Sequence, residues 1–253
     1  CCLCSITPRQ SLSGRALTAL TIHVPRLNDE LWDARQLALI WQQVEEAGDG
    51  AEVSFDFSRC DFLRPNAVVF LGGLARLIVH RGGKVQLLTK TMHGRVEANL
   101  QQNGFAHAMG ADTPPWRGNA IPYQEHLRQD KDKIIESLKQ DWLGRGWINL
   151  SDSLANRIAG QMWEIFTNAF EHSDTPVGVY SCGQYLPMRR ELLLAVADFG
   201  VGIPSNVRMY LGCPEMTAAE TMRWAFVSGH TTQRMQTFPR GLGLDLLKDF
   251  VQK

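Results

Sequence analysis

The sequence predicts an α/β protein with two domains. Its 253 residues, 44% of them hydrophobic, are enough for two cores of ordinary size. Strand-like and helix-like patterns alternate through the first half, as in an α/β domain. Residues 110–122 are rich in proline and glycine, which is typical of a linker. We therefore expect domains at residues 1–112 and 146–253, joined by a linker and a connecting helix at residues 113–145.

Composition restricts the classes of function. The 26 basic residues balance 26 acidic ones, so no overall field favours nucleic acid or a membrane surface as a partner. No apolar run approaches the roughly 18 residues that span a bilayer, and the N-terminus lacks a signal-peptide pattern. Cys60, Cys182 and Cys213 are scattered singly, as reduced intracellular thiols are. We expect a cytoplasmic protein.

The first domain is predicted to alternate strands and helices. Runs of β-branched and apolar residues favour strands, and apolar residues every three or four positions favour helices. Gly82-Gly83 precedes the third strand, and Asn103-Gly104 ends the third helix. The expected strands are residues 16–24, 51–57 and 84–89, and the expected helices are residues 29–47, 65–80 and 94–102.

Four segments of this half resemble, in order, the STAS domains of anti-sigma-factor antagonists. They are residues 53–58, 60–65, 81–88 and 96–105. The resemblance implies a STAS-like fold for the first domain. Partner-switching antagonists carry a phosphorylatable Ser or Thr at the second segment's turn, where this chain has Asn66. Because an amide has no hydroxyl to accept a phosphoryl group, we expect no phospho-switch at that position.

The second half begins with an amphipathic helix, for which Ser151 or Asp152 is a suitable N-cap. Its expected buried stripe comprises Leu154, Ile158, Met162, Ile165, Phe166 and Ala169. Glu164, Asn168 and His172 lie on another line. Positions four apart differ by only about 40° around a helix, so Glu164 and Asn168 present a carboxylate and an amide to one place. By itself this pattern is more typical of a solvated face.

Two glycine motifs follow the helix. Residues 191–198 predict a buried strand that ends in Asp198, and Gly200 and Gly202 then allow a base or sugar to approach the backbone. Asp-Phe-Gly at this place also matches the magnesium motif of protein kinases, but the other kinase motifs do not precede it.

The second glycine motif is Gly241-Leu-Gly243, which opens a helix predicted over residues 244–251. The free N–H groups and the positive dipole end of that helix would face phosphates. Arg240 stands just before the motif as a charge partner.

In order and spacing, the helix and the two glycine motifs resemble the N, G1 and G2 boxes of the GHKL ATPases. This family comprises the ATP-binding domains of gyrase, MutL, chaperones and histidine kinases. The resemblance covers roughly residues 150–252 and implies a Bergerat-type α/β sandwich that binds ATP with Mg²⁺. It implies that Asp198 accepts a hydrogen bond from the adenine amine. Asn168 would supply an oxygen to the magnesium ion, and Glu164 would act as the general base.

Residues 229–234, which include Thr231 and Thr232, resemble the family's ATP lid. His172 brings the helix closer to the anti-sigma-factor kinases than to sensor histidine kinases, although it could equally be a core or capping residue. The only candidate phospho-accepting histidine is His126, in a helix expected over residues 123–143, and it lacks the sequence context of an H-box.

One departure concerns the end of the chain. Family members continue after the third motif with two further strands, whereas this sequence ends at Lys253. We therefore expect a sheet that lacks its last strands. Either the sequence is a fragment of a longer chain, or it is a short natural variant, or a homodimer or another partner supplies the sheet edge.

Three functions remain open from the sequence. The leading one is a signalling or regulatory protein in which Mg-ATP binding and slow hydrolysis act through the lid, the STAS-like domain and a protein partner. The second is a serine/threonine protein kinase of anti-sigma type that acts on a separate partner. The third is a non-catalytic, nucleotide-binding interaction module.

Overall fold

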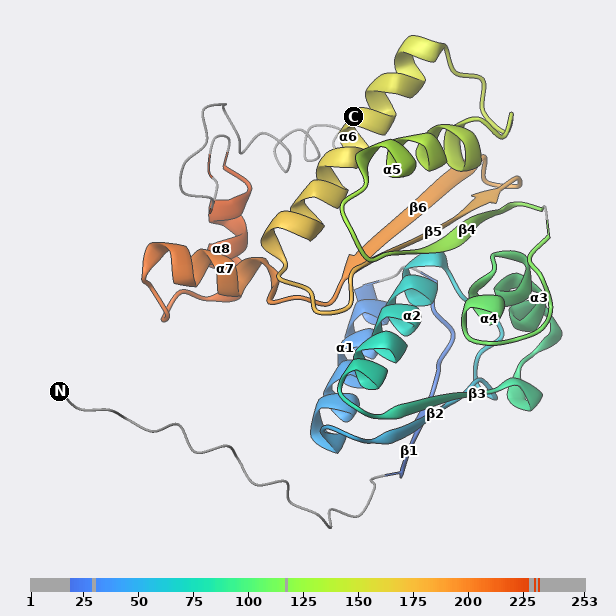
Figure 1. The fold of residues 1–253 in the computed structure, drawn as a ribbon, viewed down its shortest axis with the longest axis horizontal. Coiled ribbons are helices and arrows are strands. Elements are labelled where there is room, and N and C mark those ends of the chain that lie inside the picture. Colours follow the sequence, from blue (N-terminus) through green and yellow to red (C-terminus); the bar gives the residue numbers. More distant parts are fainter. Residues whose placement is uncertain (1–18, 29–30, 117, 228–229, 231, 233–253) are drawn as a thin grey trace.

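The computed structural model describes residues 19–28, 31–116, 118–227, 230 and 232. Within them, the chain is an α/β protein with two separate three-stranded sheets, one parallel and one antiparallel (Figure 1). The α/β class predicted from the sequence is confirmed.

The parallel sheet contains β1 (Ala19–His23), β2 (Glu52–Asp56) and β3 (Lys84–Leu88), in that order. The crossover helices are α1 (Leu31–Ala47) and α2 (Pro65–His80), and the latter has the predicted bounds. Pro65 suits the first turn of α2, where a backbone N–H would lack a helical partner. The sheet is followed by η1 (Thr89–Thr91), α3 (Gly94–Gln102) and α4 (Phe105–Ala108).

The antiparallel sheet contains β4 (Ala120–His126), β5 (Val179–Leu186) and β6 (Glu191–Asp198). The remaining helices are α5 (Lys131–Ser137), the π-helical η2 (Leu138–Leu143), α6 (Asp152–His172), α7 (Gly202–Leu211) and α8 (Ala218–Ala225).

The helix predicted over residues 123–143 is wrong in its first third. Tyr123 and His126 belong to β4, whose alternating side chains pair with β5, a strand that was not predicted. The helix begins instead at Lys131, because the Asp130 carboxylate accepts a hydrogen bond from the N–H of Lys133 and caps α5.

The layers of the molecule alternate between sheet and helix. Helices α1 and α2 lie between the two sheets, and α5 and α6 cover the far face of the antiparallel sheet (Figure 1). One hydrophobic core runs from the parallel sheet through α2 to β5 and the end of β6. A second core fills the space between the antiparallel sheet and α5, η2 and α6. The two halves of the chain therefore share a core around α2.

Two consecutive glycines let α2 approach the antiparallel sheet closely. A Cβ atom on Gly72 would lie 2.6 Å from Cζ of Tyr123, and one on Gly73 would lie 2.8 Å from Cζ of Phe199. Glycine within a helix costs about 1 kcal/mol relative to alanine. The close packing of the two aromatic rings accounts for glycine at these positions.

An ion pair flanks this contact. Nε of Arg76, on α2, lies 3.0 Å from both carboxylate oxygens of Glu125, on β4, and Nη2 donates to the carbonyl of Ala108 at 2.8 Å. The Tyr123 hydroxyl donates to the same carboxylate at 3.2 Å. Charge-assisted, bidentate contacts of this kind fix orientation as well as adding stability. They fix the position of α2 relative to the antiparallel sheet.

Candidate functional site

Helix α6 carries the first group of predicted site residues. Its N-cap is Ser151, whose hydroxyl accepts a hydrogen bond from the N–H of Leu154 at 3.3 Å. Ala159, Phe166 and Ala169 are buried against the antiparallel sheet. Leu154 was predicted in the buried stripe, but 43% of it is exposed. The reason is that the first turns of α6 project beyond the sheet (Figure 1).

The predicted line of polar residues on α6 runs from solvent into the structure. Glu164 is exposed, whereas Asn168 and His172 are half-buried. His172 Nδ1 lies 3.0 Å from the hydroxyl of Thr232, a residue of the predicted lid. At about 1.5 Å of rise per residue, Asn168 lies about 6 Å and Glu164 about 12 Å along the axis from His172.

The C-terminal end of α6 is joined directly to the turn after β6. The N–H of Val201 donates to the carbonyl of Ser173 at 2.7 Å, and the Asn206 side chain donates to the carbonyl of His172. Gly200 lies so close that an added Cβ would stand 2.6 Å from Cβ of Ser173. Glycine is therefore required at position 200 by contact with α6, in addition to any role toward a ligand.

Asp198 ends β6 at this junction. The residue as a whole is exposed, and Oδ1 of its carboxylate accepts a hydrogen bond from the N–H of Gly200 at 3.0 Å. The surrounding protein desolvates the carboxylate and raises its pKa, an effect that the N–H of Gly200 and the Ser173 hydroxyl partly offset. Gly202 follows with φ of 75°, a conformation that favours glycine, and begins α7.

The structure thus brings five predicted site residues into one region: His172, Asp198, Gly200, Gly202 and Thr232. Asn168 and Glu164 lie one and two turns away on α6. Thr231, Arg240, Gly241 and Gly243 lie outside the described residues. The helix predicted over residues 244–251 lies there too.

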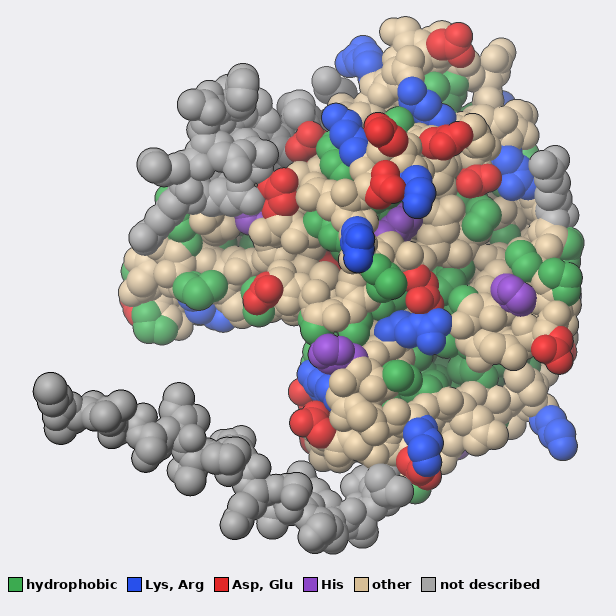
Figure 2. All heavy atoms as spheres, viewed as in Figure 1, with side chains coloured by type: hydrophobic (Ala, Val, Ile, Leu, Met, Phe, Trp, Pro, Cys, Tyr) green, Lys and Arg blue, Asp and Glu red, His purple; other side chains and the backbone are tan. Residues whose placement is uncertain are grey.

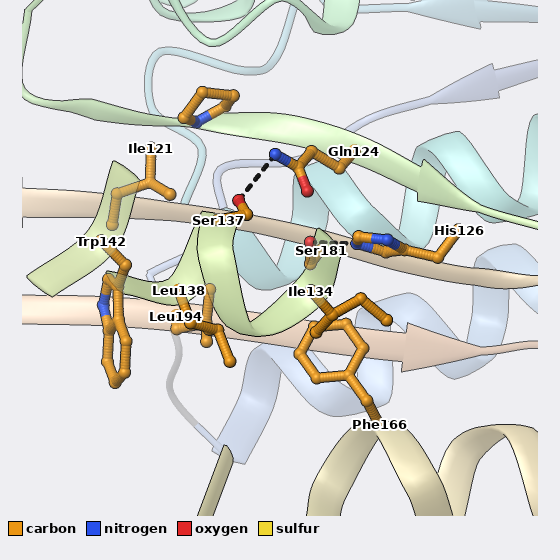
Figure 3. A pocket seen from close by; sticks show the side chains of 11 residues that line it. Ile121, Gln124, His126, Ile134, Ser137, Leu138, Trp142, Phe166, Ser181 and Leu194 are labelled. Carbon is orange, nitrogen blue, oxygen red and sulfur yellow. Dashed lines mark hydrogen bonds between the residues drawn. The ribbon is translucent and has the colours of Figure 1, made fainter. Parts of the chain in front are cut away.

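A small cavity on the outer face of the antiparallel sheet was not predicted. The residues that line it, shown in Figure 3, are Ile121, Pro122, Gln124, His126, Ile134, Ser137, Leu138, Trp142, Phe166, Ser181 and Leu194. Gln124 donates to the Ser137 hydroxyl at 2.8 Å, which in turn donates to Asp141 at 3.1 Å. The enclosed space admits little more than a water molecule. The cavity is therefore too small for a nucleotide or a metabolite.

His126 lies at one end of this cavity. Its Nε2 is 2.9 Å from the Ser181 hydroxyl, and its ring is nearly perpendicular to that of Phe166, with the centroids 5.2 Å apart (Figure 3). Burial lowers the pKa of His126 to about 4, so the ring is neutral at physiological pH. A half-buried histidine engaged in this way is poorly placed to receive a phosphoryl group.

Comparison of the chain with known protein families, curated proteins and solved structures finds no match. In the part of the chain that the structure describes, no helix is long and apolar enough to cross a membrane. The same residues contain no group of three or more His, Cys, Asp or Glu side chains suited to a metal ion. A magnesium ion held mainly by phosphate oxygens and water does not need such a group.

Proposed function

We propose that this chain is a regulatory ATP-binding protein of the GHKL type, in which Mg-ATP binds where α6 meets the turn between β6 and α7. One observation carries the proposal: the backbone of Gly200-Val201 packs on Ser173 at the end of α6. This contact brings the carboxylate-glycine turn and the polar line of α6 together, although Ser173 and Asp198 are 25 positions apart in the sequence.

The roles of the residues follow from their chemistry. The carboxylate of Asp198, a residue at the surface, would accept a hydrogen bond from the exocyclic amine of adenine, and Gly202 would let the nucleotide approach the backbone. Asn168 is half-buried, and its amide oxygen is the hard ligand that magnesium prefers. The ion would neutralise charge on the phosphates. By the resemblance to the GHKL family, Thr231 and Thr232 would belong to a lid, and Arg240, Gly241 and Gly243, which lie outside the described residues, would contact the phosphates.

Slow hydrolysis is the leading activity, with Glu164 as the base that orients and deprotonates water. The exposure of Glu164 also favours a second candidate. A base at the surface can reach a hydroxyl on another protein, as a serine/threonine kinase of anti-sigma type requires. In either case the STAS-like first half works through contact with a protein partner in the cytoplasm.

The test is incubation with γ-labelled ATP and Mg²⁺, alone and with candidate protein partners. Released phosphate supports an ATPase, and label on a partner supports a kinase. Binding without either product identifies a non-catalytic module. Glu164→Gln is expected to retain ATP binding and lose turnover, and Asn168→Ala is expected to lose the magnesium dependence of binding. Turnover of Glu164→Gln at the parent rate contradicts the role of Glu164.

A further inference from the structure

Phe199 lies between Asp198 and Gly200 in the candidate nucleotide turn, but its side chain points into the hydrophobic core. Asp198 before it is exposed and Gly200 after it is half-buried, but only 7% of Phe199 itself is exposed. The ring is part of the core that α1, α2 and both sheets share. The same turn therefore carries a ligand-facing carboxylate and a core aromatic residue side by side.

The ring of Phe199 is held by aromatic residues from three elements. It stacks on Trp41 of α1 with centroids 5.6 Å apart and meets Phe70 of α2 at 5.8 Å. Tyr180 of β5 contacts it edge to face at 5.9 Å. Aromatic pairs of this kind contribute beyond the area that they bury. On the α2 side, the ring packs so closely on the helix backbone at Gly73 that a Cβ atom would not fit between them.

The turn is thus fixed on two sides. On one side, the N–H of Val201 donates a hydrogen bond to the carbonyl of Ser173 at the end of α6. On the other side, Phe199 is seated against α1 and α2. A displacement of α1 or α2 has to move the ring or open a void, because packed cores change between discrete arrangements instead of deforming smoothly. The ring is covalently next to Asp198, so its movement alters the direction of the carboxylate.

We propose that Phe199 is a positioning residue that sets the Asp198–Gly200 turn from the α1–α2 layer, and so couples nucleotide binding to the first half of the chain. The inference rests on the proposed nucleotide site. Coupling between two sites is reciprocal in binding free energy. A partner that shifts α1 or α2 therefore alters nucleotide affinity, and nucleotide alters the affinity for that partner by the same factor. Because Trp41 stacks on Phe199, nucleotide binding also changes the environment of Trp41.

Tyr123 provides a matched control. It is an aromatic residue of the same core, packs on the neighbouring Gly72 and stacks on Tyr180, but it lies on β4 and is not covalently next to the residues of the turn. Phe199→Leu and Tyr123→Leu each remove a ring that α2 contacts. A merely structural role predicts that both variants lose stability and that ATP affinity falls alike in both. A positioning role predicts a loss of affinity for Phe199→Leu alone.

The experiment measures Mg-ATP affinity by calorimetry for the wild type and both variants, with thermal unfolding of each. We expect Phe199→Leu to bind about tenfold more weakly, and Tyr123→Leu to bind within twofold of the wild type. In parallel, fluorine NMR of the 5-fluorotryptophan-labelled wild type follows Trp41, whose resonance is assigned with Trp41→Phe. We expect the Trp41 resonance to shift on addition of Mg-ATP.

The outcomes separate the two proposals. A wild type that does not bind Mg-ATP overturns the proposed function and this inference with it. A wild type that binds Mg-ATP without any shift at Trp41 overturns only the coupling. Equal loss of affinity in the two leucine variants, or no loss in Phe199→Leu, likewise refutes the positioning role and leaves the nucleotide site standing. The Trp41 measurement tests the coupling in the wild type even if Phe199→Leu does not fold.

Discussion

Replacing Gly73 by alanine tests the shared core most sharply, because two effects of opposite sign compete. Alanine in place of glycine within a helix normally stabilises a protein by about 1 kcal/mol. At position 73, the new Cβ would overlap the Phe199 ring, which Trp41, Phe70 and Tyr180 hold on its other sides. Overpacking of a core costs about 1–3 kcal/mol. Because the neighbouring rings leave Phe199 little room to give way, we take the overlap to cost about 2–3 kcal/mol. Less the gain of about 1 kcal/mol from helix propensity, the net destabilisation is about 1–2 kcal/mol.

Gly160 is the matched control for this substitution. It lies inside α6, is exposed, and has no atom within 4 Å of an added Cβ. Gly160→Ala should therefore stabilise the protein by about 0.5–1 kcal/mol. Because 1 kcal/mol corresponds to about 2–4 °C in Tm for a chain of this size, thermal unfolding followed by circular dichroism separates the two variants by several degrees.

The direction of the change decides this prediction. Gly73→Ala should melt below the wild type and Gly160→Ala above it. If Gly73→Ala is as stable as the wild type or more so, the Phe199 ring does not pack on α2 as described, and the shared core and the coupling built on it are wrong.

Two further predictions concern protonation and phosphorylation. The pKa of His126 is about 4 in the folded protein, against 6.5 in the unfolded chain. The contribution of this group to the free energy of unfolding is therefore fully kept above pH 6.5 and is lost as the pH falls toward 4. Urea titrations should show a loss of about 2 kcal/mol from this group between pH 7 and pH 5, which His126→Gln removes; an unchanged pH dependence in that variant contradicts the assignment. Incubation with Mg-ATP should add no phosphate within residues 58–70, because Asn66 cannot accept it. A stoichiometric phosphoryl group on Ser58 by mass spectrometry contradicts this and favours the kinase.

Much of the first half could be predicted because its elements are set by local pattern. Pro65 fixed the start of α2, and the apolar run after it left no alternative to a buried helix. The error over residues 123–143 arose because β4 is an edge strand of alternating character that depends on β5 for its hydrogen bonds. Such pairing is a long-range interaction, which local periodicity does not contain.

The residue types of the candidate site were predictable, but the packing contacts that hold them in place were not. Asp198 before two glycines was visible in the sequence as the end of a strand. The contact of Gly200 with Ser173 and the burial of Phe199 were not, because both join segments that are distant in the chain. The pair Gly72-Gly73 was a usable signal for the burial of Phe199, because two glycines inside an apolar helix indicate that another element approaches closely.

Calorimetric titration with Mg-ATP shows whether the turn between β6 and α7 binds nucleotide. We predict saturable binding of one nucleotide to the wild type. We also predict at least about tenfold weaker binding to Asp198→Asn, since a hydrogen bond to a charged acceptor contributes about 1.5–3 kcal/mol. A wild type that gives no heat of binding, or an Asp198→Asn variant with wild-type affinity, would contradict the assignment of the turn between β6 and α7 as the nucleotide site.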